Sequence, residues 1–113
     1  MMKKLACVLL FSLMATNTFA MPEYRAQMQE RLKASKKLSI DFENGIAVGR
    51  LLGLFEKYFG NINITYDPKV DQDKEITIDT GFNNGLVTFE KVLHRANLQY
   101  QVVGPNTIKI LPK

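Results

Sequence analysis

Apolar and polar residues alternate, with the period of a β-strand, in five stretches of the chain. In the first stretch Leu38, Ile40 and Phe42 alternate with polar residues. Such alternation is typical of a strand that buries one face. The pattern returns at residues 62–66, 76–79, 98–102 and 107–111. The sequence therefore predicts five short strands, each with one apolar and one polar side.

Residues 46–59 carry apolar side chains at the spacing of an α-helix. The apolar face consists of Val48, Leu51, Leu52, Phe55 and Phe59, and it is widened by Ala47, Leu54 and Tyr58. The widened face spans roughly 160° at 100° per residue, so we expect this helix to be covered from more than one direction. Gly49 and Gly53 lie one turn apart on its polar side and leave room for a close neighbour.

A second helix is predicted over residues 86–96, whose apolar positions have the same spacing. Gly60 and Asn97 follow the two helices, where a residue in the left-handed conformation ends a helix. The pair Asn44-Gly45 is expected to end the first strand, and residues 81–85 are expected to form a loop. The strand–helix–strand unit thus occurs twice along the chain. The sequence thus predicts an α+β fold of two βαβ-type units, with two helices between two small β-sheets.

Residues 21–37 precede this domain and are predicted to form an N-terminal amphipathic helix. Tyr24, Met28 and Leu32 would form a narrow apolar stripe along it, and Pro22 suits its first turn. The segment holds five basic and two acidic residues, whereas residues 38–113 hold eight basic and nine acidic residues. We interpret it as a solvated or partly ordered lead-in helix. The alternative is a docking arm for a partner protein or an anionic membrane surface.

Residues 1–20 have the three parts of a secretory signal peptide. Lys3 and Lys4 make a basic start, residues 5–15 form an apolar run too short to span a membrane, and a polar stretch ends at Ala20. We predict export and cleavage after Ala20. The lone cysteine, Cys7, belongs to this signal. The remaining chain therefore has no thiol for a disulfide, a nucleophile or a metal site.

The chain after residue 20 contains few groups suited to catalysis. His94 is the lone histidine, and its helical phase places it away from the apolar face, so we interpret it as a solvated surface residue. The carboxylates in residues 67–75 lack the glycine and the distal glutamate of a calcium loop, and we interpret them as a solvated turn. The nearly neutral domain disfavours nucleic-acid binding. We predict no cofactor, no bound metal and no enzymatic activity.

Residues 38–111 resemble the short N-terminal domain shared by secretins and by TonB-dependent receptors that signal. The resemblance lies in the run LSIDFENGIAVGRLLGLFEKYFGNINITYDPKV, followed by KEITIDTG and then by VLHRANLQYQVVGPNTIKILPK. It implies two helices between two small sheets, with Val70 tucked under a sheet. Two departures are Asn97 in place of a glycine and Asn83-Asn84-Gly85 in place of a Ser or Thr cap, so we expect the second helix to start late.

The resemblance also implies a function. In secretins the domain contacts inner-membrane parts of a secretion or pilus machine, and in receptors it contacts a sigma regulator. Because nothing follows Lys113, we predict a free-standing periplasmic protein–protein interaction module, accessory to a secretion, pilus or conjugation machine. The alternatives are a signalling domain that contacts a receptor or anti-sigma regulator, and a small periplasmic ligand-binding protein or enzyme. The last would need a deep pocket around His94, Asp79 and Tyr100.

Partner binding is expected at exposed strand edges, because small sheets leave backbone groups unpaired. The last strand of the chain is one candidate edge, and the apolar stripe of the arm is a second candidate surface. The residues concerned are Thr107, Ile108, Lys109, Ile110 and Leu111 in the strand and Tyr24, Met28 and Leu32 in the arm.

Overall fold

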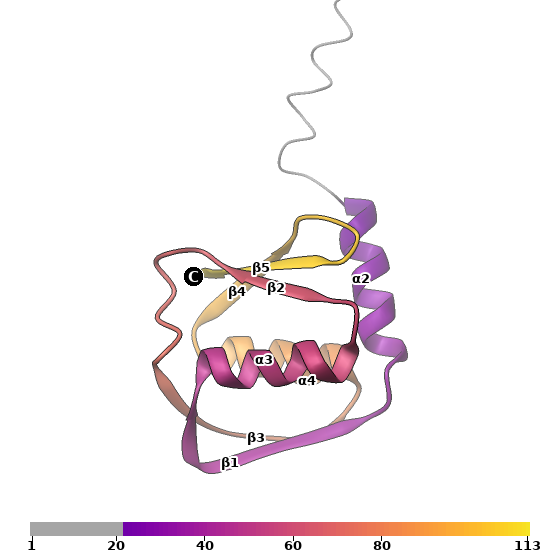
Figure 1. Ribbon diagram of the computed structural model, residues 1–113. Helices are drawn as coiled ribbons and strands as arrows, with labels where there is room; N and C mark the ends of the chain where they lie inside the picture. Colours follow the sequence, from indigo (N-terminus) through magenta and orange to yellow (C-terminus); the bar gives the residue numbers. More distant parts are fainter. Residues whose placement is uncertain (1–21) are drawn as a thin grey trace, which may run out of the picture.

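Two α-helices lie between two small β-sheets, and a third helix stands at one end of this stack (Figure 1). The computed structural model describes residues 22–113, so the predicted signal peptide lies outside the described residues. The elements are α2 (Pro22–Ala34), β1 (Leu38–Ala47), α3 (Val48–Phe59), β2 (Asn63–Tyr66), β3 (Glu75–Asn83), α4 (Gly85–Arg95), β4 (Leu98–Val102) and β5 (Thr107–Pro112). The predicted α+β fold is confirmed.

The two-stranded sheet consists of β1 and β3, paired antiparallel. Both strands are longer than predicted. Asn44-Gly45 does not end β1, because the strand absorbs the pair as an irregularity in register between Phe42 and Ile46, with Gly45 at φ 96°. Similarly, β3 continues to Asn83 through Gly81 at φ 68°, so residues 81–85 are not the expected loop. Glycine adopts these positive φ values without strain, which lets each strand bend and go on.

The three-stranded sheet has the order β2-β5-β4. The central strand, β5, is parallel to β2 and antiparallel to β4. Its Ile108 and Ile110 are at most 1% exposed and lie in the same core as the helices. Val70, in the connection between β2 and β3, is also buried in this core, as expected.

The centre of the core lies between α3 and α4. The rings of Phe55 and Phe89 meet edge to face with their centroids 5.5 Å apart. Gly60 after α3 and Asn97 after α4 have the predicted positive φ, at 67° and 61°. However, α4 does not start late, because the side chain of Asn84 accepts a hydrogen bond from the backbone N–H of Val87 at 2.9 Å and caps the helix.

Helix α2 is part of the domain and not a solvated arm. Met28 and Leu32 are 1% and 0% exposed and belong to the common core. The helix contacts α4 and β4. Arg31 of α2 donates hydrogen bonds to the carbonyl oxygen of Pro105 and to Oδ1 of Asn106, each at 3.0 Å. The interpretation as a solvated lead-in helix is therefore corrected, whereas contact of the segment with a partner protein or an anionic membrane surface stays a prediction.

No helix in residues 22–113 is long and apolar enough to cross a membrane.

Candidate functional site

The last strand of the chain does not have the free edge that made it a candidate for partner binding. Residues 107–111 belong to β5, which pairs with β2 on one side and with β4 on the other. Its position at the end of the sequence says nothing about its position in the sheet, because a parallel pairing with β2 inserts it between two earlier strands. Thr107, Ile108, Lys109, Ile110 and Leu111 are therefore corrected from edge to centre.

The apolar stripe on α2 is likewise already covered within the chain. Met28 and Leu32 are buried, and Tyr24 is half-buried against the same core. These three side chains therefore hold α2 on the domain, and the surface that they were expected to offer to a partner is occupied.

Side chains of the helices cap the outer edges of β2 and β3. On β2, the backbone N–H of Ile64 donates to Oε2 of Glu56 from α3 at 2.6 Å. On β3, Arg95 of α4 donates from Nε to the carbonyl oxygen of Thr77 at 2.9 Å. Lys91 of α4 likewise donates to the carbonyl oxygen of Thr80 at 3.0 Å. Charged side chains on an edge strand hinder pairing with another strand.

Strand β4 contacts α2 and α4 through the side chain of Tyr100. Gln29 of α2 donates to the phenolic oxygen of Tyr100 at 2.9 Å, and that hydroxyl lies 3.3 Å from Oε2 of Glu90, to which it donates. The guanidinium of Arg25 lies 4.9 Å from the centroid of the Tyr100 ring. Burial raises the pKa of the Tyr100 phenol above its usual value, as does Glu90, whereas Gln29 and Arg25 act in the opposite direction.

Strand β1 differs from the edge strands β2 and β3, whose outer edges side chains of the helices cap. It pairs with β3 on one side, and within residues 24–113 no side chain or backbone group bonds to its other edge. Helix α3 contacts β1, and its Leu54 and Tyr58, one turn apart on the same side of the helix, are 42% and 41% exposed. Tyr58 donates from its hydroxyl to the carbonyl oxygen of Lys36, just before β1, at 2.6 Å. The unpaired backbone edge of β1 therefore lies next to exposed apolar side chains of α3.

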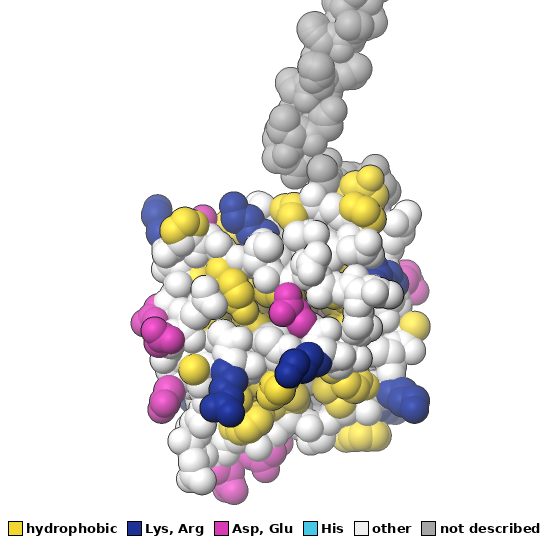
Figure 2. All heavy atoms as spheres, viewed as in Figure 1, with side chains coloured by type: hydrophobic (Ala, Val, Ile, Leu, Met, Phe, Trp, Pro, Cys, Tyr) yellow, Lys and Arg dark blue, Asp and Glu magenta, His cyan; other side chains and the backbone are white. Residues whose placement is uncertain are grey.

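The space-filling view shows this face of the molecule. Hydrophobic side chains gather over α3 and β1 in the lower half of Figure 2, with basic side chains among them. On β1 itself the apolar side chains are partly buried against the core and border the same surface. We call this the α3–β1 surface and define it by Leu38, Ile40, Phe42, Leu54 and Tyr58.

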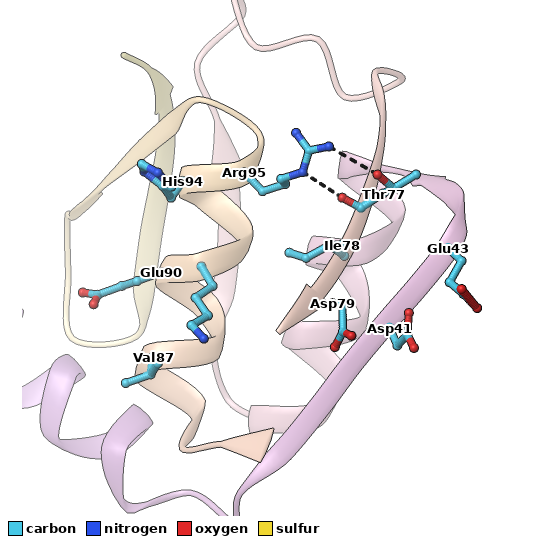
Figure 3. Close-up of a pocket in the computed structure, with 10 residues that line it drawn as sticks. Asp41, Glu43, Thr77, Ile78, Asp79, Val87, Glu90, His94 and Arg95 are labelled. Atoms are coloured by element: carbon cyan, nitrogen blue, oxygen red, sulfur yellow. Dashed lines mark hydrogen bonds between the residues drawn. The ribbon is translucent and has the colours of Figure 1, made fainter. Parts of the chain in front are cut away.

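The opposite face of the β1–β3 sheet is acidic. Asp41 lies directly across from Asp79 in the register of the two strands, and the labelled carboxylates lie close together in Figure 3. Glu43 and Glu75 are exposed on the same strands. In the described part of the chain, none of these four carboxylates is in a salt bridge. Like charges directly opposite one another destabilise a sheet.

A hollow with a volume of about 810 Å³ lies between α4 and β3 (Figure 3). His94 and Asp79 line it, and His94 also borders a second hollow, lined by Tyr100, on the β4 side of α4, so Asp79 and Tyr100 do not share a hollow. His94 is exposed, as predicted, and within the described residues its imidazole makes no hydrogen bond to a carboxylate. In Figure 3 its side chain points away from Asp79. The three residues whose convergence would indicate a ligand site are thus not brought together.

The carboxylates of residues 67–75 are occupied in turns. Oδ1 of Asp67 accepts from the backbone N–H of Lys69, and Oδ1 of Asp71 accepts from that of Asp73, at 2.9 and 3.0 Å. Residues 22–113 contain no group of three or more His, Cys, Asp or Glu side chains placed to hold a metal ion. The structure thus agrees with the interpretation of this segment as a turn.

The sequence contained a signal for the α3–β1 surface that its interpretation missed. Leu54 and Tyr58 widened the predicted apolar face of α3, and we expected further cover for them within the domain. The structure covers the centre of that face and leaves these two side chains exposed. The edge caps Glu56, Lys91 and Arg95 were missed because nothing local in the sequence indicates which strand edge a helix will flank.

Comparisons of the chain with protein-family models, with characterised proteins and with solved structures gave no match. The resemblance to the secretin and receptor domain therefore stays a prediction.

Proposed function

We propose that the protein is a non-enzymatic protein–protein interaction module, which works in the periplasm as an accessory component of a secretion, pilus or conjugation machine. The observation that carries the proposal is the open edge of β1 beside exposed Leu54 and Tyr58. Unpaired backbone groups on an edge strand can bond to a strand of another protein. Apolar side chains next to that edge add favourable burial when the partner docks.

The contrast with the other edges supports this choice of surface. Glu56 caps the outer edge of β2, and Arg95 and Lys91 cap the outer edge of β3. An open sheet edge favours unwanted association, so proteins usually protect it. A chain that caps the edges of β2 and β3 and leaves a ten-residue strand open, beside exposed apolar side chains, is expected to use that strand for binding.

The predicted signal peptide and the resemblance to the secretin domain supply the setting. A signal peptide implies work outside the cytoplasm, and the resemblance implies contacts with other parts of an envelope machine. An open strand edge beside exposed apolar side chains suits an adaptor that docks between such parts.

Crosslinking in intact cells tests the proposal. A photoreactive amino acid at position 54 should capture a component of an envelope-assembly machine. The matched control is position 103, because Val103 is 39% exposed and Leu54 is 42% exposed, but Val103 lies in the β4–β5 turn. Capture from position 54 and not from position 103 supports the proposal. Absence of any envelope-assembly component from both positions contradicts it.

A further inference from the structure

We infer that the open edge of β1 takes up, as a third strand, an extended segment of the partner protein in which apolar and basic residues alternate. This inference rests on the proposed function and adds the chemistry of the partner. The inference is argued from the two faces of the β1–β3 sheet, because the side chains of an added strand point alternately to one face and to the other.

The face toward α3 requires apolar side chains from the partner. Glu56 and Tyr58 fix the orientation of α3, since Glu56 bonds to β2 and Tyr58 bonds next to the start of β1. Residues two apart on a helix point to opposite flanks, so Tyr58 lies on the β1 side. Leu54 is one turn before Tyr58 on the same side. A third strand beside β1 would therefore place every second side chain against Leu54 and Tyr58.

The outer face of the sheet requires basic side chains from the partner. Asp41 and Asp79 face each other across the two strands, and Glu43 extends the negative charge along β1. Arg95 bonds to Oγ1 of Thr77 and thus approaches this face from β3, the side away from the open edge. Opposite charges on neighbouring strands stabilise a sheet. A Lys or Arg of the added strand, beside Asp41, would relieve the repulsion between the two aspartates.

Exposed cations on α3 fix which side of the added strand carries the basic residues. Arg50 is one turn before Leu54, and Lys57 lies between the two flanks of the helix, so both point outward above the open edge. A segment in the opposite phase would bring its Lys or Arg side chains toward Arg50 and Lys57. The two faces therefore select both the composition of the segment and its phase.

Hydrogen exchange with synthetic peptides tests the inference. The protein, expressed from its complete sequence, is mixed with a blocked peptide of about seven residues that alternates Val and Lys. We expect slower exchange of backbone amides in β1. An alternating Val–Glu peptide and a Val–Lys peptide of the same composition, with its lysines grouped at one end, are the comparison probes. Both comparison peptides should bind at least about fivefold more weakly than the alternating Val–Lys peptide. The Val–Glu peptide reverses the charge, and the peptide with grouped lysines lacks the alternation.

A charge reversal on β1 sharpens the test. Asp41→Lys removes the like-charge pair with Asp79, so the fold is retained, and it should shift preference about fivefold from the Val–Lys to the Val–Glu peptide. Asp73→Lys is the matched control, because Asp73 is an exposed carboxylate in the turn before β3. It makes the same change in net charge and should leave the preference unchanged.

The outcomes separate the inference from the proposed function. Equal binding of the Val–Lys and Val–Glu peptides, slowed exchange in β3 or β4 in place of β1, or no binding of any peptide overturns the inference. If position 54 still captures an envelope component in cells, the proposed function stands while the chemistry assigned to its partner is wrong. If position 54 captures a segment that alternates apolar and basic residues, both stand.

Discussion

At the scale of single residues, the glycines of the two core helices differ in what surrounds them. A Cβ on Gly85, at the start of α4, would lie 2.7 Å from the carbonyl oxygen of Leu32 and 2.6 Å from Cε1 of Phe59. A Cβ on Gly53, within α3, would meet no atom within 4 Å. Gly85 thus allows the end of α2 to approach α4, whereas Gly53 has no packing role of that kind.

Gly85→Ala should lower the free energy of unfolding by about 1–3 kcal/mol, because the backbone of α2 must move away from α4. Helix propensity alone predicts the opposite sign. Gly53→Ala is the control and should raise the free energy of unfolding by about 0.5–1 kcal/mol. Urea unfolding, followed by circular dichroism, measures both. A stabilising Gly85→Ala would show that the contact between α2 and α4 is looser than described.

Tyr100 connects stability to pH. Burial, followed by the effects of its charged and hydrogen-bonding neighbours, raises the pKa of its phenol above the ordinary value of 10.0. The unfolded chain therefore releases this proton at a lower pH than the folded chain does. The contribution of the shift to stability is complete below pH 10, and it is lost as pH rises toward and through the raised pKa.

Tyr100→Phe should make the loss of stability at alkaline pH less steep than in the unchanged protein. At neutral pH the variant should be less stable by about 1 kcal/mol, because Gln29 and Glu90 lose their bonds to the phenol. Urea unfolding of both proteins between neutral and alkaline pH gives the two profiles. Taking the difference removes the other titrating groups, which the proteins share. Parallel profiles would mean that the Tyr100 phenol titrates alike in the folded and unfolded chains.

At the scale of elements, the sequence predicted which segments are strands and helices better than where they end. Alternation of apolar residues identified every strand, because burial of one face depends on local period alone. The ends of β1 and β3 were wrong at Gly45 and Gly81. A glycine with positive φ ends a strand in one context and forms an irregularity within it in another, and the paired strand decides between the two.

The order of strands in a sheet depends on contacts between distant segments, and it was the part of the candidate site that sequence could not supply. β5 pairs with β2, a strand about forty residues earlier in the chain, as in the pair Ile64 and Ile108. This pairing moved the predicted edge at residues 107–111 to the centre of the sheet. The open edge belongs to β1, which was among the predicted strands. Its edge is open because β1 pairs with β3 alone and because Glu56 and Arg95 bond to β2 and β3.

At the scale of the whole molecule, α2 makes the described chain one folding unit. The separation of residues 21–37 from residues 38–113 in the sequence rested on composition and charge. In the structure, Met28 and Leu32 share one core with α3, α4 and both sheets. A helix that contributes fully buried side chains to a common core should unfold together with that core.

Leu32→Ala tests this unity of the molecule. Leu32 is 0% exposed, so its truncation should lower the free energy of unfolding by about 2–5 kcal/mol. For a domain of this size, that change should lower the midpoint of thermal unfolding by roughly 10 °C or more. Lys33→Ala, at the exposed neighbouring position, should change the free energy by less than about 0.5 kcal/mol.

Helix content by circular dichroism and core packing by tyrosine fluorescence should be lost in one transition. If Leu32→Ala instead left the midpoint unchanged and removed a minor part of the helical signal at lower temperature, α2 would be a separate appendage, and the α3–β1 surface would belong to a domain that folds without it.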